Sequence, residues 1–393
     1  MTLPGINHLL AQPEKYLKGK TVGLVVNHTS LAKDHKHSIA HFNSHPSFTL
    51  TSLFAPEHGL FGIAQDMIEI ENEVDPVSGL TISSLYGKTE ATLEPDPAAL
   101  AGIDNLIFDI QDVGARYYTF IYTMAKCMDI CKKSGTRMIV CDRPNPINGI
   151  SLEGNLVAED YRSFVGQYPL PNRHAMTAGE LALFFNHEID IGCELKVVPL
   201  THWNREQWYD ETGLPWVPPS PNMPTLDTAV VYPGMCLIEG TQLSEGRGTT
   251  RPFENFGAPY IDPHKLLQRI ESDLDQLPGV MFRPEFFQPM FQKHQGETCG
   301  GLQIHVTDRN QFKPLSTTIA LLRAIAELYP NDFKWRTEPY EFVSDRLAID
   351  LLYGNTALRE IIFDDSFSLA NLEESWQEEL ACFKEVRNNY LIY

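Results

Sequence analysis

One short stretch of the chain places acid–base side chains at the end of an apolar run. The stretch LFAPEHGLFG follows Thr49–Phe54, whose length and alternation predict a buried β-strand. Pro56 and Gly59 end that strand, so the carboxylate of Glu57 and the imidazole of His58 should lie in the loop after it. Ligands of open α/β sheets bind outside the carboxyl ends of strands, which makes Glu57 a candidate acid. Taken alone, the motif is better explained by a structural role, in which Glu57 caps the next turn and His58 is an ordinary polar loop residue.

Further polar groups follow other expected strands. Apolar runs at Thr21–Val26, Asn105–Ile110 and Arg137–Cys141 alternate with helical stretches, which predicts right-handed βαβ units and a doubly wound parallel sheet of the α/β class. Parallel strands end at one edge of a sheet, so the polar residues after these runs should gather there. They are Asn27, Glu57, Asp112, Arg116 and Arg143.

Carboxylates are the side chains that hydrolysis of a glycosidic bond needs. One carboxyl group protonates the leaving oxygen, and a second one usually acts as base or nucleophile. Asp112, in DIQDVGAR, could fill the second role or could cap the helix that begins near Ala115. Carboxylates in loop-like polar motifs are Glu57, Asp109, Asp112, Glu153 and Glu245.

Two stretches offer groups that could hold a sugar. Arg116 and Tyr118 would lie in the first turn of the helix, where they could hydrogen-bond to a sugar or stack on it. The stretch GTQLSEGRGTTR has glycines that would let the backbone approach a ligand, and Arg247 and Arg251 could clamp a carboxylate. A surface turn is the usual fate of such a Gly- and Thr-rich segment.

Other chemistries have weaker support in the sequence. No GxGxxG follows the first strand and no GxxxxGK occurs, so we expect no nucleotide cofactor. Histidines 35, 37, 41 and 45 lack a carboxylate or Cys at ligand spacing, so a solvated helix face is favoured and no metal is expected. Ser30–Lys33 matches the SxxK motif of serine acyl-enzymes, but the partner motifs SDN and KTG are absent.

Length and charge limit the remaining classes. A chain of 393 residues predicts about two domains. The proline-rich segment Leu214–Pro224 reads as an extended connection, so we expect a sheet domain over residues 1–213 and an α+β auxiliary domain over 214–393. A net charge of −20 without long basic runs argues against nucleic acid as a partner.

Targeting signals and cysteine usage indicate the compartment. No signal peptide and no run of about 18 apolar residues is found, so we expect no membrane association. The seven cysteines are scattered and form no CxxC pair, which is typical of reduced thiols. We therefore expect a cytoplasmic protein, unless a leader has been removed.

With these motifs in order, the chain resembles the bacterial exo-β-N-acetylmuramidases of the NamZ type. The matches run from about residue 20 to residue 262, and the residues after them match only loosely. Ala175 and Gln242 stand where the family tends to have Gly and Asn. The matching stretches are VGLVVNHTS, LFAPEHGLFG, SLYG, FDIQDVGARYYTF, DRPNPING, LEG, SFVGQYPLPNRHAMTAGELA, WVPPSPNMPTLDTAVVYPG and EGTQLSEGRGTTRPFENFGAPY.

The resemblance implies a Rossmann-like catalytic domain with a smaller auxiliary domain and a cleft between them. The implied activity is release of N-acetylmuramic acid (MurNAc) from non-reducing ends of peptidoglycan fragments such as MurNAc–GlcNAc, in cell-wall recycling. Glu57 matches the family's proposed catalytic glutamate and would be the general acid, with His58 and Asn27 positioning it. The second carboxylate would be Asp112, or the substrate's own 2-acetamido group would serve instead.

MurNAc carries a lactyl carboxylate, so an acidic protein needs placed cations to hold it. Arg247 is our first choice for this contact. A noncatalytic muropeptide-binding protein is the alternative function, and a serine acyl-enzyme acting on cell-wall peptides is a weaker one. The expected substrate contacts are Asn27, His28, Arg116, Tyr118, Arg143, Asn145, Arg173, His174, Asn222, Glu245, Arg247 and Thr249.

Overall fold

The apolar runs at the start of the chain form the central strands of a seven-stranded sheet. In the computed structural model, which describes residues 1–69 and 71–393, the strand order is β3-β4-β2-β1-β5-β6-β9. Every pairing is parallel except that of β3 with β4. The order reverses at β1, as a doubly wound sheet requires, so the predicted fold class is confirmed. The strands are β1 (Thr21–Val26), β2 (Thr49–Ala55), β3 (Glu73–Val74), β4 (Thr81–Ser84), β5 (Asn105–Asp109), β6 (Arg137–Cys141) and β9 (Leu195–Val198).

Helices cover both faces of this sheet because its central strands are apolar on both sides. Val25 of β1 packs in the same core as α4 (Phe120–Ser134) and α5 (Ala178–His187). Its neighbours Leu24 and Val26 pack on the opposite face with α1 (Gly5–Ala11) and α3 (Ser38–Ser44). The short α2 (Pro13–Tyr16) follows α1.

Several predicted elements are present with shifted ends. The helix expected over Leu31–Asn43 is only α3, since Asn27–Lys36 forms turns held by buried polar contacts. The capping box at Thr177 is present and starts α5. Asp262 caps α7 (Pro263–Ile270), which changes into a 3-10 helix sooner than predicted. The 3-10 helices are η1 (Glu90–Leu93), η2 (Pro97–Leu100), η3 (Glu159–Tyr161), η4 (Tyr209–Glu211), η5 (Cys236–Gly240) and η6 (Glu271–Gln276).

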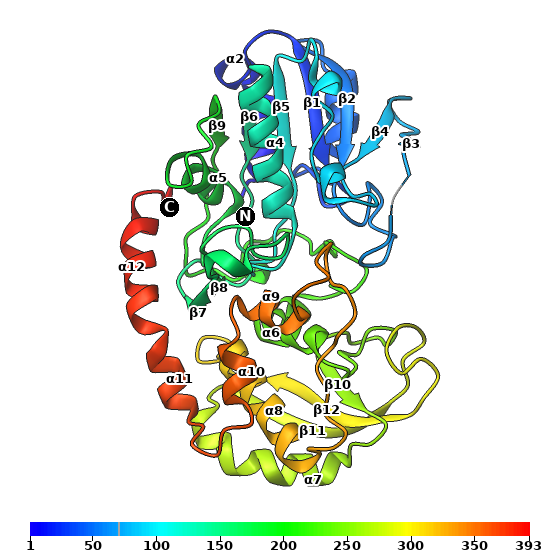
Figure 1. Ribbon diagram of the computed structural model, residues 1–393. Coiled ribbons are helices and arrows are strands. Elements are labelled where there is room, and N and C mark those ends of the chain that lie inside the picture. The colour runs from blue at the N-terminus through cyan, green and yellow to red at the C-terminus, as the bar shows by residue number, and fades with distance from the viewer. Residues whose placement is uncertain (70) are drawn as a thin grey trace.

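A second, smaller lobe lies below the sheet lobe in Figure 1. Its three-stranded antiparallel sheet has the order β10-β12-β11 and packs against α7. A small hairpin of β7 and β8 lies at the junction of the lobes. The further elements are β7 (Glu153–Leu156), β8 (Pro171–Arg173), β10 (Asn255–Ala258), β11 (Val280–Phe287), β12 (Cys299–Val306), α6 (Leu226–Met235), α8 (Pro314–Leu328), α9 (Ala348–Tyr353) and α10 (Ala357–Ile361).

The C-terminal helices return to the sheet lobe. α11 (Leu369–Ser375) and α12 (Gln377–Asn388) run up the side of both lobes, drawn in red in Figure 1. Phe383 of α12 packs against Phe184 of α5, and the Tyr393 hydroxyl donates a hydrogen bond of 2.7 Å to Asp142 Oδ2. Residues that we expected to belong to the auxiliary domain therefore pack against the sheet lobe. The division of the domains at residue 213 stays a prediction.

Two expectations about surfaces concern membranes and metals. Over residues 1–69 and 71–393, no helix is both long and apolar enough to cross a lipid bilayer. Three of the four neighbouring histidines have separate partners: His37 contacts the Asn27 carbonyl, His41 contacts Asp34, and His45 stacks on Phe48.

Candidate active site

Glu57 lies in a pocket whose walls come from both lobes. The strand β2 ends at Ala55, and positive φ angles at His58 (69°) and Gly59 (76°) turn the chain sharply after it. The pocket together with the open solvent at its mouth has an empty volume of about 480 Å³. Residues of the sheet lobe that line it include Glu57, His58, Asp66, Tyr118 and Thr119, and those that follow residue 213 include Asn222, Glu239, Arg247, Tyr340 and Glu341.

Glu57 is 5% exposed, and its carboxyl group accepts hydrogen bonds from two donors. Thr119 Oγ1 donates to Glu57 Oε2 at 2.8 Å, and the Met67 amide donates to Oε1 at 3.3 Å. In the part of the chain that the structure describes, no hydrogen bond joins His58 to this carboxyl group. His58 Nδ1 instead donates a hydrogen bond of 2.9 Å to the Ala64 carbonyl. Glu57 is thus oriented by Thr119 and Met67, and His58 fixes the loop that carries Met67.

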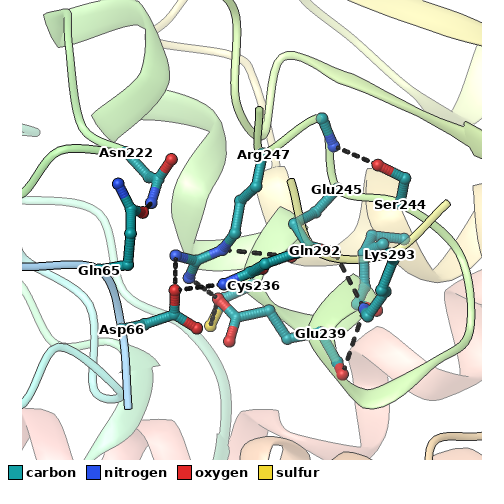
Figure 2. Close-up of polar contacts among 12 residues, drawn as sticks. Gln65, Asp66, Asn222, Cys236, Glu239, Ser244, Glu245, Arg247, Gln292 and Lys293 are labelled. Carbon is teal, nitrogen blue, oxygen red and sulfur yellow. Dashed lines mark hydrogen bonds and ion pairs between the residues drawn. The ribbon is translucent and has the colours of Figure 1, made fainter. Parts of the chain in front are cut away.

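That loop, residues 59–69, closes one side of the pocket and is called the pocket loop below. It reaches the second lobe through Gln65, which accepts a hydrogen bond of 2.7 Å from Asn222, and through Asp66. Asp66 Oδ1 lies 2.7 Å from both Arg247 Nη1 and Gln292 Nε2, as Figure 2 shows. The pocket loop therefore connects the two lobes directly over the site.

Arg247 is the centre of a buried charge cluster. Besides Asp66, it contacts Glu239 at 2.8 Å through Nη2 and Glu245 at 3.1 Å through Nε (Figure 2). Lys293 lies 2.9 Å from the other oxygen of Glu245. Burial opposes the charge on Arg247, but these three carboxylates outweigh it and raise its pKa well above the usual value. Burial raises the pKa of Glu239 in spite of the attraction of Arg247.

Three arginines expected to bind substrate lie outside the lining of this pocket. Arg116 is fully buried, and its guanidinium donates to four backbone carbonyls. Arg143 forms a buried ion pair of 2.7 Å with Asp109. Arg173 donates to the Ile147 carbonyl. Their donors stabilise the backbone and β5 rather than facing the space beside Glu57.

The other expected residues divide between the pocket and its surroundings. Asp112 Oδ2 accepts a hydrogen bond of 2.8 Å from Gly114 N and lies 3.5 Å from His174 Nε2, so it is held in a turn outside the pocket lining. Tyr118 and Asn222 do line the pocket. Those outside its lining, each with hydrogen-bonding partners in turns or loops, are Asn27, His28, Asn145, Glu245 and Thr249.

Sequence reasoning missed several polar residues of the pocket. Thr119 and Glu239 lie inside motifs already quoted: Thr119 directly follows Tyr118, and Glu239 precedes Glu245 by six residues. Asp66 lies seven residues after the end of the PEHG motif and carried no signal of its own. Tyr340 and Glu341 belong to the part of the chain that matched loosely, where no motif pointed to them.

Comparisons with known proteins identify the family of the chain. Residues 22–227 match the family model of the N-terminal part of the exo-β-N-acetylmuramidase NamZ, and residues 230–393 match that of its C-terminal part. The chain is 45% identical over 389 residues, 99% of its length and 91% of the relative, to "Peptidoglycan beta-N-acetylmuramidase NamZ" of Bacillus subtilis (strain 168).

Two solved structures share the whole fold. Both are DUF1343 family proteins from Bacteroides fragilis NCTC 9343. One has a TM-score of 0.87 at 33% identity, and the other has a TM-score of 0.79 at 28% identity; each match covers 100% of this chain and 99% of the other. With both halves matched by family models and a relative aligned over nearly its full length, the chain belongs to the NamZ family of exo-β-N-acetylmuramidases.

Proposed function

We propose that this chain hydrolyses the glycosidic bond of a non-reducing terminal MurNAc in peptidoglycan fragments, with MurNAc–GlcNAc as a substrate. It is a glycosidase of a family named for this activity, and its Bacillus subtilis relative is a peptidoglycan β-N-acetylmuramidase. The observation that carries the proposal is the pocket of Glu57, where buried carboxyl groups from both lobes line one small space. Glycosidic hydrolysis needs carboxyl groups placed in this way.

Glu57 is proposed as one of the groups that perform the reaction. Its carboxyl group lines the pocket, and neither of its oxygens is engaged by a cation within 4.0 Å among the described residues. Asp112 does not line this space, so the second carboxylate is sought among the groups that do. Tyr118 and Asn222 supply polar contacts for the sugar.

Arg247 is the proposed partner of the lactyl carboxylate. Among the described residues that line the pocket, it is the one Lys or Arg. Its Nη1 is held by Asp66 of the pocket loop, whereas Glu239 and Glu245 lie close to it in sequence. A substrate carboxylate could therefore replace Asp66 at Nη1 when the pocket loop moves, without disturbing the other two contacts.

A reducing compartment is the proposed location. All seven cysteines are free thiols, and six of them are buried. Buried, unpaired thiols are typical of proteins kept in a reducing environment such as the cytoplasm.

The test replaces Glu57 by Gln and measures turnover of a 4-nitrophenyl β-MurNAc glycoside together with affinity for MurNAc. We expect turnover to fall by about 10³-fold or more while affinity is retained, because the amide keeps the shape but neither gives nor takes the proton. Glu153→Gln is a matched control, since Glu153 is also a buried glutamate but lies outside the pocket. Wild-type protein that binds MurNAc without turnover would favour the noncatalytic binding function.

A further inference from the structure

A second glutamate enters the pocket from a strained turn of the second lobe. Tyr340 and Val343 exchange two backbone hydrogen bonds of 2.9 Å, and the turn between them consists of Glu341 and Phe342. Both central residues have positive φ angles, 45° and 68°. Such turns prefer Asn-Gly, and non-glycine residues with these φ angles are strained. The surrounding structure therefore holds Glu341 where it is against a local preference.

The neighbours of this turn fix the direction of Glu341. Phe342 packs against Tyr86 and Phe164 of the sheet lobe, with ring centroids 5.6 and 6.3 Å apart. The Tyr86 hydroxyl donates a hydrogen bond of 3.0 Å to Glu341 Oε2. Two side chains of the turn thus contact the opposite lobe, and the carboxyl group lines the same pocket as Glu57.

Glu341 differs from the other second-lobe acid of the pocket in having no cation. Glu239 is paired with Arg247, whereas no Lys, Arg or His among the described residues lies within 4.0 Å of the Glu341 carboxyl group. Only 5% of Glu341 is exposed. A buried carboxyl group without a cation favours its neutral, protonated form. Burial first, and then the charge of Glu57, raise the pKa of Glu341 well above the usual value.

We propose that Glu341 is a catalytic residue of this site and donates the proton to the glycosidic oxygen, while Glu57 works as the carboxylate. The proposal rests on the function proposed above. It gives Glu57 the ionised role instead of the acid role expected from its motif, because both Glu57 oxygens already accept hydrogen bonds, from Thr119 and Met67. Two carboxyl groups whose surroundings differ in this way are the usual basis for separate acid and base roles.

The proton balance of the reaction is simple. The bond between C1 of MurNAc and the glycosidic oxygen breaks with its electron pair going to oxygen, and the proton of Glu341 forms the new O–H bond of the leaving sugar. The oxygen of one water becomes bonded to C1, and a proton of that water passes to the carboxylate of Glu57. Exchange with solvent then returns a proton to Glu341 and removes one from Glu57, so the net reaction consumes one water.

The test compares two substrates that differ in their need for a proton donor. In Glu341→Gln, kcat/KM for MurNAc–GlcNAc should fall by about 10²–10⁴-fold, because the sugar leaves poorly without a proton. For 2,4-dinitrophenyl β-MurNAc, whose leaving group needs no proton, the fall should be less than about tenfold. Glu57→Gln should lose activity on both substrates. Glu338→Gln, an exposed glutamate three residues earlier, should behave as wild type.

A second variant covers the case in which Glu341→Gln does not fold. Tyr86→Phe removes a hydrogen bond that lowers the pKa of Glu341, so the alkaline limb of the kcat/KM profile should move to higher pH. Equal losses on both substrates in Glu341→Gln, or an alkaline limb unmoved by Tyr86→Phe, would overturn the role of Glu341. Wild-type protein inactive on both substrates would instead overturn the proposed function.

Discussion

A substitution of Arg116 tests whether this residue of a quoted motif binds the substrate or stabilises the folded chain. Its Nη1 donates to the carbonyls of Asn155 and Leu170 at 2.7 and 2.8 Å, and its Nη2 donates to those of Leu352 and Tyr353, both at 2.8 Å. The last two carbonyls end α9 of the second lobe, where a cation also complements the helix dipole. One guanidinium thus connects the two lobes.

The cost of Arg116→Lys follows from this geometry. The ammonium keeps the charge, but a compact donor cannot reach four carbonyls arranged around a planar fork. Leaving two of them without a partner at about 1–2 kcal/mol each gives a loss of roughly 3 kcal/mol. For 393 residues, about 2.1 cal/mol/K of unfolding entropy per residue amounts to about 0.8 kcal/mol/K. The melting temperature should therefore fall by about 4 °C.

Calorimetry and steady-state kinetics on the same preparation decide the matter. We expect Arg116→Lys to lower the melting temperature and to leave KM for a 4-nitrophenyl β-MurNAc glycoside near the wild-type value at 25 °C. Arg283→Lys is the control, because that arginine has a side chain 53% exposed and should change neither quantity. An unchanged melting temperature together with a tenfold rise in KM would refute the reasoning and assign Arg116 to substrate binding.

Three further variants probe the loop and the buried acids. Asp66→Asn should lower KM for MurNAc glycosides several-fold, because the lactyl carboxylate no longer competes with the Asp66 carboxylate for Arg247. A higher KM would mean that the ion pair between Asp66 and Arg247 is needed to keep the pocket in shape. Gly62→Ala should increase proteolysis of the pocket loop, since Gly62 has φ 65° and a methyl group there would overlap the His28 ring. Burial raises the pKa of Asp142 from 3.8 to about 7, so between these pH values the folded state keeps a proton that the unfolded state has lost. The free energy of unfolding should therefore fall as pH rises from about 4 to 7. Asp142→Asn should reduce that fall in urea unfolding at a series of pH values.

The sheet could be predicted because its strands are nearly uninterrupted apolar runs. β1, β5 and β6 begin and end within a residue of the expected positions, since strands buried on both faces have no alternation to misread. The helix after β1 was overestimated because Ser30 and Ser38 bind the Asp109 backbone and side chain, a contact between distant segments. Such contacts have no local signature.

The site was predictable only where local spacing carried the information. Glu57 follows a strand and precedes a glycine turn, and this context is visible in the sequence. The sequence around an arginine in a polar motif does not show whether the side chain binds a ligand or other groups of the protein. Arg116 and Arg143 were therefore expected to contact the substrate, whereas they lie outside the lining of the pocket. The Glu341 carboxyl group is oriented by a hydrogen bond from Tyr86, which lies 255 residues earlier in the chain. No pattern in the sequence around Glu341 indicates that contact.

The return of the C-terminal segment has a consequence for how the protein is made. Tyr393 and Asp142 are separated by 251 residues, yet the tyrosine supplies one of the donors to that buried acid, and the Ile392 amide donates to Glu180 at 2.9 Å. During synthesis the sheet lobe emerges from the ribosome long before these partners exist. The sheet lobe should therefore reach its full stability only after residues 392 and 393 have been synthesised, and removal of α12 together with these residues should destabilise the sheet lobe.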